Sequence, residues 1–92
     1  MLKNDIDEIY ELCKRVITEQ PEVYCLFDFS PGTMGVLLYK DRKKLDTKSG
    51  PPDFNITIFC DGLTVRPSGK DAYEKTRKTL LELLENKEQN ND

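Results

Sequence analysis

Two short motifs in the chain combine residue types that do chemistry in other proteins. The first, Ser68-Gly69-Lys70-Asp71, opens a predicted helix in the manner of a phosphate-binding loop. The full loop pattern is G-x-x-x-x-G-K-[ST], and Thr64 and Asp71 stand at two of its defining positions. We therefore do not predict a nucleoside triphosphate site, although the helix N-terminus with Lys70 leaves a looser anion site open.

The second motif joins Asp28 to Asp41-Arg42-Lys43 and is similar to the D…(D/E)-x-K metal site of many nucleases. The hairpin predicted for residues 23–40 places Asp28 beside its turn and Asp41 beyond the far end of the partner strand. At about 3.3 Å per residue the two carboxylates lie roughly 20 Å apart, a separation that one metal ion cannot bridge. The spacing therefore predicts no metal site.

The chain contains no histidine, which removes the commonest general base and the commonest metal ligand. Its three cysteines, Cys13, Cys25 and Cys60, form no C-x-x-C pair, and their odd number argues against a disulfide framework. Each falls on the apolar side of a predicted element, where a free thiol acts as a small hydrophobic side chain. The sequence predicts buried thiols, and it predicts neither catalysis nor a bound metal or cofactor.

The composition is typical of one folded domain, with 92 residues of which 37% are hydrophobic and 34% charged. No apolar run approaches the length of about 18 residues needed to span a membrane, and the N-terminus lacks the apolar region of a signal peptide. These features predict a cytoplasmic protein with a single α+β domain over residues 1–86. The acidic tail, residues 87–92, is predicted to be disordered because it has no apolar side chain to bury.

Residues 23–40 carry the clearest structural pattern, two alternating strands joined by Ser30-Pro31-Gly32-Thr33. Proline fixes one backbone dihedral angle of such a turn, and glycine accepts a positive one. The register that this turn implies sets apolar residues against apolar residues on both faces of the hairpin. Its pairs are Phe29 with Met34, Phe27 with Val36, Cys25 with Leu38, Leu26 with Leu37 and Tyr24 with Tyr39.

Amphipathic helices are predicted on either side of the strands. The first begins with Asp5 as its cap, where Glu8 completes a capping box, and it ends near Gln20 because a proline follows. The second begins near Ser68 or Asp71 and carries a leucine-rich face.

After the hairpin the sequence predicts a mixed-charge loop over residues 41–53, a third strand over 54–60 and a short fourth strand over 63–66. The order α-β-β-β-(β)-α describes an antiparallel meander of three to four strands with an N-terminal and a C-terminal helix. Both helices are predicted to cover one face of this sheet. The residues expected on that face are Phe27, Phe29, Val36, Leu38, Phe54, Ile56 and Ile58.

The opposite face of the sheet is predicted to carry a second apolar set. Its members are Tyr24, Leu26, Leu37, Tyr39 and Phe59. If it is uncovered, such a cluster exceeds the apolar patch that a monomer usually exposes, and it indicates a dimer or partner-protein interface. Alternatively, a helix or the 41–53 loop covers it, or the sheet curls. We expect a protein-interaction module that binds a second copy or a host factor through this face and the exposed sheet edge.

Two basic segments support a different function, the binding of nucleic acid. Residues 40–48 and 66–78 are rich in lysine and arginine, although the formal net charge of the whole chain is −3. The candidate contacts are Lys40, Arg42, Lys43, Lys44, Arg66 and Lys70. The predicted element order differs from the β-α-β-β-α-β order of common RNA-binding sheets, so nucleic-acid binding is the alternative function.

The layout of the chain resembles that of small uncharacterised proteins of bacteriophages and integrated elements. The shared features are an N-terminal helix, an aromatic-rich strand, a second strand ending in Tyr39, Ile56-x-Ile58-x-x-Asp61 and a leucine-rich final helix. The resemblance spans most of the chain, although a tryptophan often seen after the second strand of those proteins is absent. It implies a non-enzymatic accessory or host-interaction role.

Overall fold

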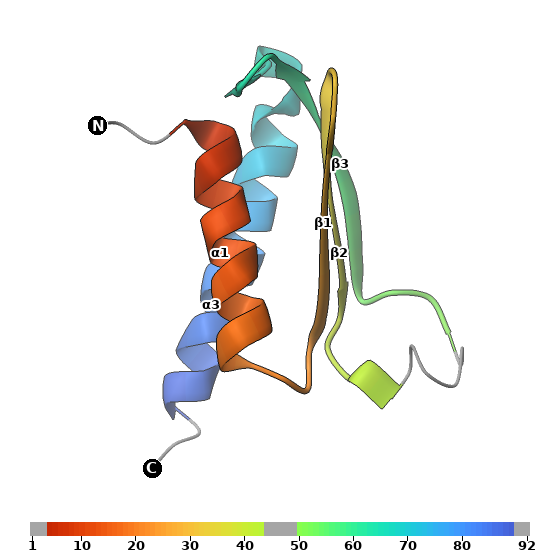
Figure 1. Cartoon of the computed structure of the whole chain (residues 1–92), viewed down its shortest axis with the longest axis vertical. Coiled ribbons are helices and arrows are strands. Elements are labelled where there is room, and N and C mark those ends of the chain that lie inside the picture. The colour runs from red at the N-terminus through yellow and green to blue at the C-terminus, as the bar shows by residue number, and fades with distance from the viewer. Residues whose placement is uncertain (1–3, 44–49, 90–92) are drawn as a thin grey trace.

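The structure, a computed structural model, describes residues 4–43 and 50–89. In these ranges two long helices lie against one face of a four-stranded antiparallel sheet (Figure 1). This is the α+β fold predicted from the sequence, with the fourth strand present. The elements in chain order are α1 (Asp5–Glu19), β1 (Tyr24–Ser30), β2 (Thr33–Tyr39), β3 (Phe54–Asp61), β4 (Thr64–Val65), the 3-10 turn η1 (Pro67–Gly69) and α3 (Lys70–Gln89).

The sheet has the order β1-β2-β3-β4, so each strand pairs with its neighbours in the sequence. The register between β1 and β2 is the predicted one, with Phe29 opposite Met34 and Tyr24 opposite Tyr39. In the connecting turn Gly32 adopts a φ of 89°, a positive value that side chains disfavour and glycine tolerates. The prediction of the hairpin is therefore confirmed.

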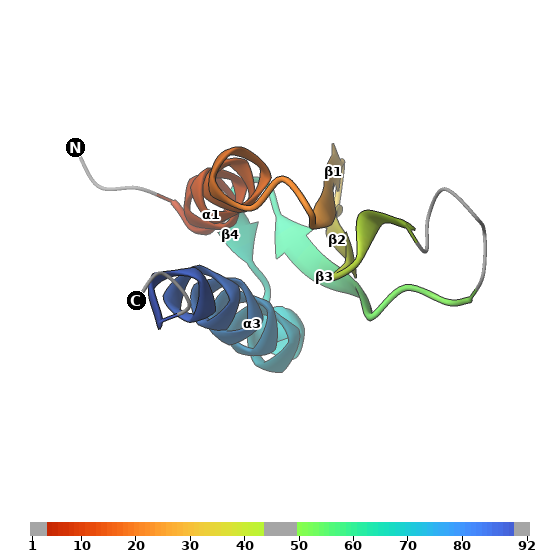
Figure 2. The same cartoon turned by 90° about the horizontal axis from the view of Figure 1, so that it is seen from below.

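Both helices cover the same face of the sheet, as Figure 2 shows from below. Alternate strand residues on this face are buried, and the helices bury their apolar stripes against them. Phe29 was predicted to lie within this core, but it remains 44% exposed because it lies beside the turn on the edge strand. Fully buried residues of the core include Ile9 and Val16 of α1, Met34 and Leu38 of β2, Ile58 of β3 and Leu80 of α3.

The predicted cap at Asp5 is wrong by one residue. Asn4 caps α1, because its side-chain oxygen accepts a hydrogen bond from the Asp7 N–H at 2.8 Å. Asp5 is the first helical residue, and its carboxylate accepts a hydrogen bond from the Val65 N–H at 3.0 Å. Asp5 therefore connects the start of α1 to β4.

Helix α3 follows directly on η1 and begins at Lys70, between the two predicted start residues. Gly69 of η1 is buried, and a Cβ added to it would lie 2.7 Å from the backbone oxygen of Phe59. Close packing against β3 accounts for the glycine in the predicted phosphate-loop-like motif. At its other end α3 extends to Gln89, so residues 87–89 of the predicted disordered tail are helical. Residues 90–92 lie outside the described part of the chain.

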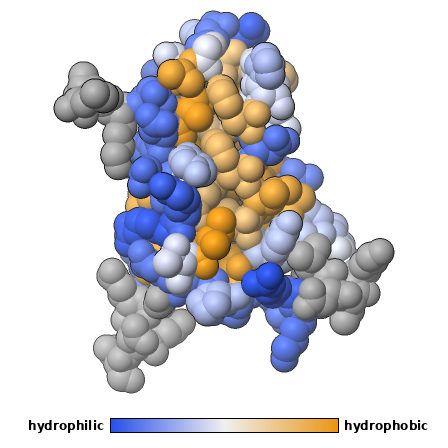
Figure 3. Space-filling view, viewed as in Figure 1, coloured by the Kyte–Doolittle hydropathy of each residue, from blue (hydrophilic) through white to orange (hydrophobic). Residues whose placement is uncertain are grey.

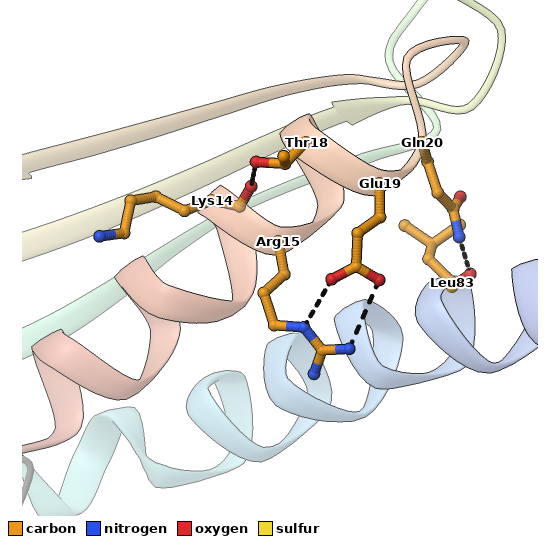
Figure 4. Close-up of polar contacts among 6 residues, drawn as sticks. All are labelled: Lys14, Arg15, Thr18, Glu19, Gln20 and Leu83. Atoms are coloured by element: carbon orange, nitrogen blue, oxygen red, sulfur yellow. Dashed lines mark hydrogen bonds and ion pairs between the residues drawn. The ribbon is translucent and has the colours of Figure 1, made fainter.

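A buried polar side chain connects the ends of the two helices. Gln20, directly after α1, is 5% exposed, and its amide donates a hydrogen bond to the backbone carbonyl of Leu83 in α3 (Figure 4). The other contacts in that view lie on the exposed surface of α1, between Arg15 and Glu19 and between Thr18 and Lys14.

Replacing Gln20 by leucine is expected to lower the free energy of unfolding by about 1–2 kcal/mol, because a buried carbonyl loses its side-chain donor. Thr18→Ala is a suitable control, because the Thr18 hydroxyl makes its hydrogen bond to the Lys14 carbonyl on the exposed surface. Its expected effect is within about 0.5 kcal/mol. Urea unfolding of both variants measures the difference, and equal losses would contradict a connecting role for Gln20.

Candidate protein-interaction surface

The sheet face opposite the helices, called the outer face below, presents an apolar cluster at one end. Tyr24 and Tyr39 lie opposite each other there, with ring centroids 6.2 Å apart, and Leu26 lies opposite Leu37 in the next row of the same face. Leu26 is 45% exposed and the other three are partly exposed. Neither helix covers these residues, because both lie on the other face (Figure 2). Residues 44–49 of the loop that was considered as a cover lie outside the described residues.

Phe59, the fifth residue predicted for this cluster, lies apart from the other four. It is on the outer face and 51% exposed, but it pairs with Thr33, whereas Leu37 pairs with Asn55. Phe59 lies four residues along the strand from Asn55, which corresponds to roughly 13 Å. The structure therefore brings Tyr24, Leu26, Leu37 and Tyr39 together, and these four residues are called the outer-face cluster.

A shallow depression of about 190 Å³ lies between the outer-face cluster and Phe59. Gly35 forms its centre, and a Cβ added there would meet the nearest atoms, Asp28 Cβ and the Ile56 carbonyl oxygen, only at 3.8 Å. Leu26 and Leu37 border the depression on the side of the cluster. The sequence reasoning missed Gly35, although a glycine inside a strand pattern often marks a place where another group approaches the backbone.

Asp28 also lines the depression, directly opposite Gly35. Its side chain is exposed, and it makes no hydrogen bond or ion pair with any residue of the ranges 4–43 and 50–89. The depression thus combines an unneutralised carboxylate with two leucine side chains. A complementary group would carry a positive charge beside an apolar side chain.

The basic residues predicted for nucleic-acid binding separate into two groups. Lys40 directly follows the last residue of β2, whereas Arg66 donates its backbone N–H to the Phe59 carbonyl at 2.9 Å, beside the first residue of β2. The length of β2, roughly 20 Å, lies between them. Arg66 also makes an ion pair with Asp61 at 2.9 Å. Arg42 and Lys43 belong to the Lys40 end, Lys70 to the Arg66 end, and Lys44 lies outside the described residues.

The register between β1 and β2 also determines the positions of Asp28 and Asp41, the two carboxylates of the nuclease-like motif. Asp28 lies opposite Gly35, and Asp41 comes after the last residue of β2, as the hairpin prediction required. Within the described residues, no group of three or more cysteine, aspartate and glutamate side chains is close enough to hold a metal ion.

The ionisable groups with shifted pKa values lie on the helix side of the sheet. Cys13, Cys25 and Cys60 are all buried, as predicted. A hydrogen bond to Cys25, and then burial, raise the pKa of Cys13, and burial raises the pKa of Cys60. Burial and a hydrogen bond to Glu8 raise the pKa of Tyr73, whose hydroxyl joins α3 to α1. Cys13, Cys60 and Tyr73 therefore stay protonated at neutral pH, whereas the hydrogen bond with Cys13 lowers the pKa of Cys25.

No helix in the described part of the chain has both the length and the apolar character needed to cross a bilayer. Comparison of the chain with protein-family models, curated proteins and solved structures finds no match. The resemblance to proteins of bacteriophages and integrated elements stays a prediction.

Proposed function

We propose that this protein is a non-catalytic interaction module whose outer sheet face binds another protein. The observation that carries the proposal is the outer-face cluster, which is partly exposed and lies beside the depression over Gly35, on the side of the sheet that neither α1 nor α3 covers. Tyrosine is a residue type favoured at the centre of protein interfaces. The proposal agrees with the accessory or host-interaction role that the resemblance implies.

The depression defines the kind of partner. An apolar side chain of the partner fits over Gly35 beside Leu26 and Leu37, and a lysine or arginine next to it pairs with Asp28. Charge complementarity of this kind fixes orientation and discriminates between partners. The partner is therefore a protein segment with a basic residue next to a large apolar one.

Selection of a displayed random peptide library on the purified protein tests this proposal. Peptides in which lysine or arginine neighbours a large apolar residue are expected to be enriched. Their affinity for Leu37→Asp is expected to fall about tenfold or more, because the variant places a charge at the centre of the contact. Gly35→Val is expected to weaken binding as strongly, because its side chain fills the depression, and its Cβ would meet the nearest atoms only at 3.8 Å.

Phe59→Ser is the control, since Phe59 is exposed but lies outside the cluster, and it is expected to leave the affinity unchanged. Circular dichroism checks that all three variants remain folded. The proposal is contradicted if no peptide distinguishes wild type from Leu37→Asp, or if Leu37→Asp unfolds the protein and so belongs to a core. It also fails if sedimentation shows that Leu37→Asp converts a dimer into a monomer, because a second copy then occupies the face.

A further inference from the structure

The free edge of β1 forms a second surface, separate from the outer-face cluster. In the described part of the chain β1 is the terminal strand of the sheet and pairs only with β2. Every second residue of such a strand directs its N–H and C=O groups away from the sheet, where they are open to another strand. The sequence of β1, YCLFDFS, has neither the lysine nor the proline that commonly protects an edge.

The apolar surface continues from this edge onto α1. Tyr10 packs against Phe27 with ring centroids 5.3 Å apart, and Tyr10, Ile17 and Phe29 are 44%, 51% and 44% exposed. Figure 3 shows an apolar band down this face of the molecule, bordered by hydrophilic surface on the side of α1. An open strand edge beside an exposed apolar helix flank offers both backbone groups and apolar surface to another chain.

We propose that two copies of this chain dimerise by antiparallel pairing of β1 with β1. A two-fold axis at Phe27, the middle residue of β1, makes the pairing self-complementary. Leu26 then lies opposite the second copy's Asp28, and Cys25 opposite the second copy's Phe29. Each residue meets one from the same face of the sheet, and no two like charges oppose each other.

The charges on α1 favour a second copy as the occupant. Tyr10 lies over Phe27 and therefore near the axis, and the two copies of α1 run antiparallel beside each other. Asp7 lies about 4.5 Å along the helix from Tyr10 in one direction, and Lys14 lies about 6 Å from it in the other. Antiparallel packing thus sets Asp7 of each copy at the level of Lys14 of the other copy, giving two opposite-charge pairs.

Lys14 is available for this contact. It is exposed, lies over the Tyr10 ring at 4.8 Å, and is 3.6 Å from Glu11 on the same helix face. An exposed pair of that kind contributes little on its own, so Lys14 can reorient toward a second copy. The dimer would join two sheets into one of eight strands and leave both outer-face clusters open. This proposal is independent of the proposed function.

Light scattering of variants in which the charge of Asp7 or of Lys14 is reversed tests the proposed dimer. At about 100 µM, where a dimer of micromolar Kd is largely formed, wild type is expected to have twice the chain mass of 10.7 kDa. In the Lys14→Glu variant the residues at positions 7 and 14 are both acidic, and in the Asp7→Lys variant they are both basic. Each variant alone is expected to weaken the dimer about tenfold or more, because like charges then face each other.

Mixing the two variants in equal amounts is expected to restore the dimer as a heterodimer, because each acidic position then faces a basic one. A change that acted only within one chain would not be reversed by mixing. The proposal is overturned if wild type is monomeric at about 100 µM, if neither variant raises the dimer Kd in a dilution series, or if the equimolar mixture has no lower Kd than the variants alone. Leu37→Asp is the control and is expected to remain dimeric. If this variant is a monomer, the two copies associate through the outer face and not through β1.

Discussion

Replacing Gly69 by alanine is expected to lower the free energy of unfolding by about 3 kcal/mol, at the upper end of the range for overpacking a filled site. The added Cβ would lie 2.7 Å from the Phe59 backbone oxygen and 3.1 Å from the Phe59 nitrogen. The oxygen cannot move away easily, because it accepts the Arg66 N–H at 2.9 Å and belongs to β3. Relief of the clash must therefore displace η1 or the start of α3, and urea unfolding measures the loss.

Gly35→Ala is the matched control, because the same change there creates contacts no closer than 3.8 Å. It is expected to change the free energy of unfolding by less than about 1 kcal/mol, and a small gain is consistent with the reduced freedom of the unfolded chain. If the two variants lost the same stability, the close approach of Gly69 to β3 would not explain why glycine occupies that position.

Gly69 also shows where prediction from this sequence ends. In the sequence it belongs to Ser68-Gly69-Lys70-Asp71 and suggests an anion loop, whereas in the fold its lack of a side chain lets η1 contact Phe59. That contact joins residues ten positions apart, and no local pattern encodes it. The cap of α1 is a similar case. Asn4 and Asp5 both suit a helix cap, and the contact of Asp5 with β4 is what the sequence does not show.

The hairpin was predictable because several constraints agree. Pro31 and Gly32 define the turn, and the alternation on both strands allows one register that matches apolar residues on each face. Because the register of the hairpin was predicted correctly, the positions of Leu26 and Leu37 in the outer-face cluster were predicted as well. Phe59 belongs to β3, and the register of β3 against β2 depends on a long connection. The alternation of apolar residues therefore predicted the face of the sheet on which Phe59 lies, but not how far it lies from the outer-face cluster.

Replacing Leu38 by alanine is expected to lower the free energy of unfolding by about 3 kcal/mol, whereas Leu37→Ala is expected to cost less than about 1 kcal/mol. The two leucines are adjacent in β2 and point to opposite faces of the sheet. Leu38 is 0% exposed in the core, opposite Cys25 and Phe54, so truncation leaves a cavity. Leu37 lies on the outer face beside the depression, where solvent fills the space.

Urea unfolding at low protein concentration measures both changes without a contribution from self-association. The comparison is well matched, because composition, strand and the loss of β propensity are the same for the two variants. A loss for Leu37→Ala equal to that for Leu38→Ala would mean that the outer face is covered in solution, and it would contradict an open binding surface there. A small loss leaves Leu37 free to contribute its apolar side chain to a partner, which is the role proposed for the outer-face cluster.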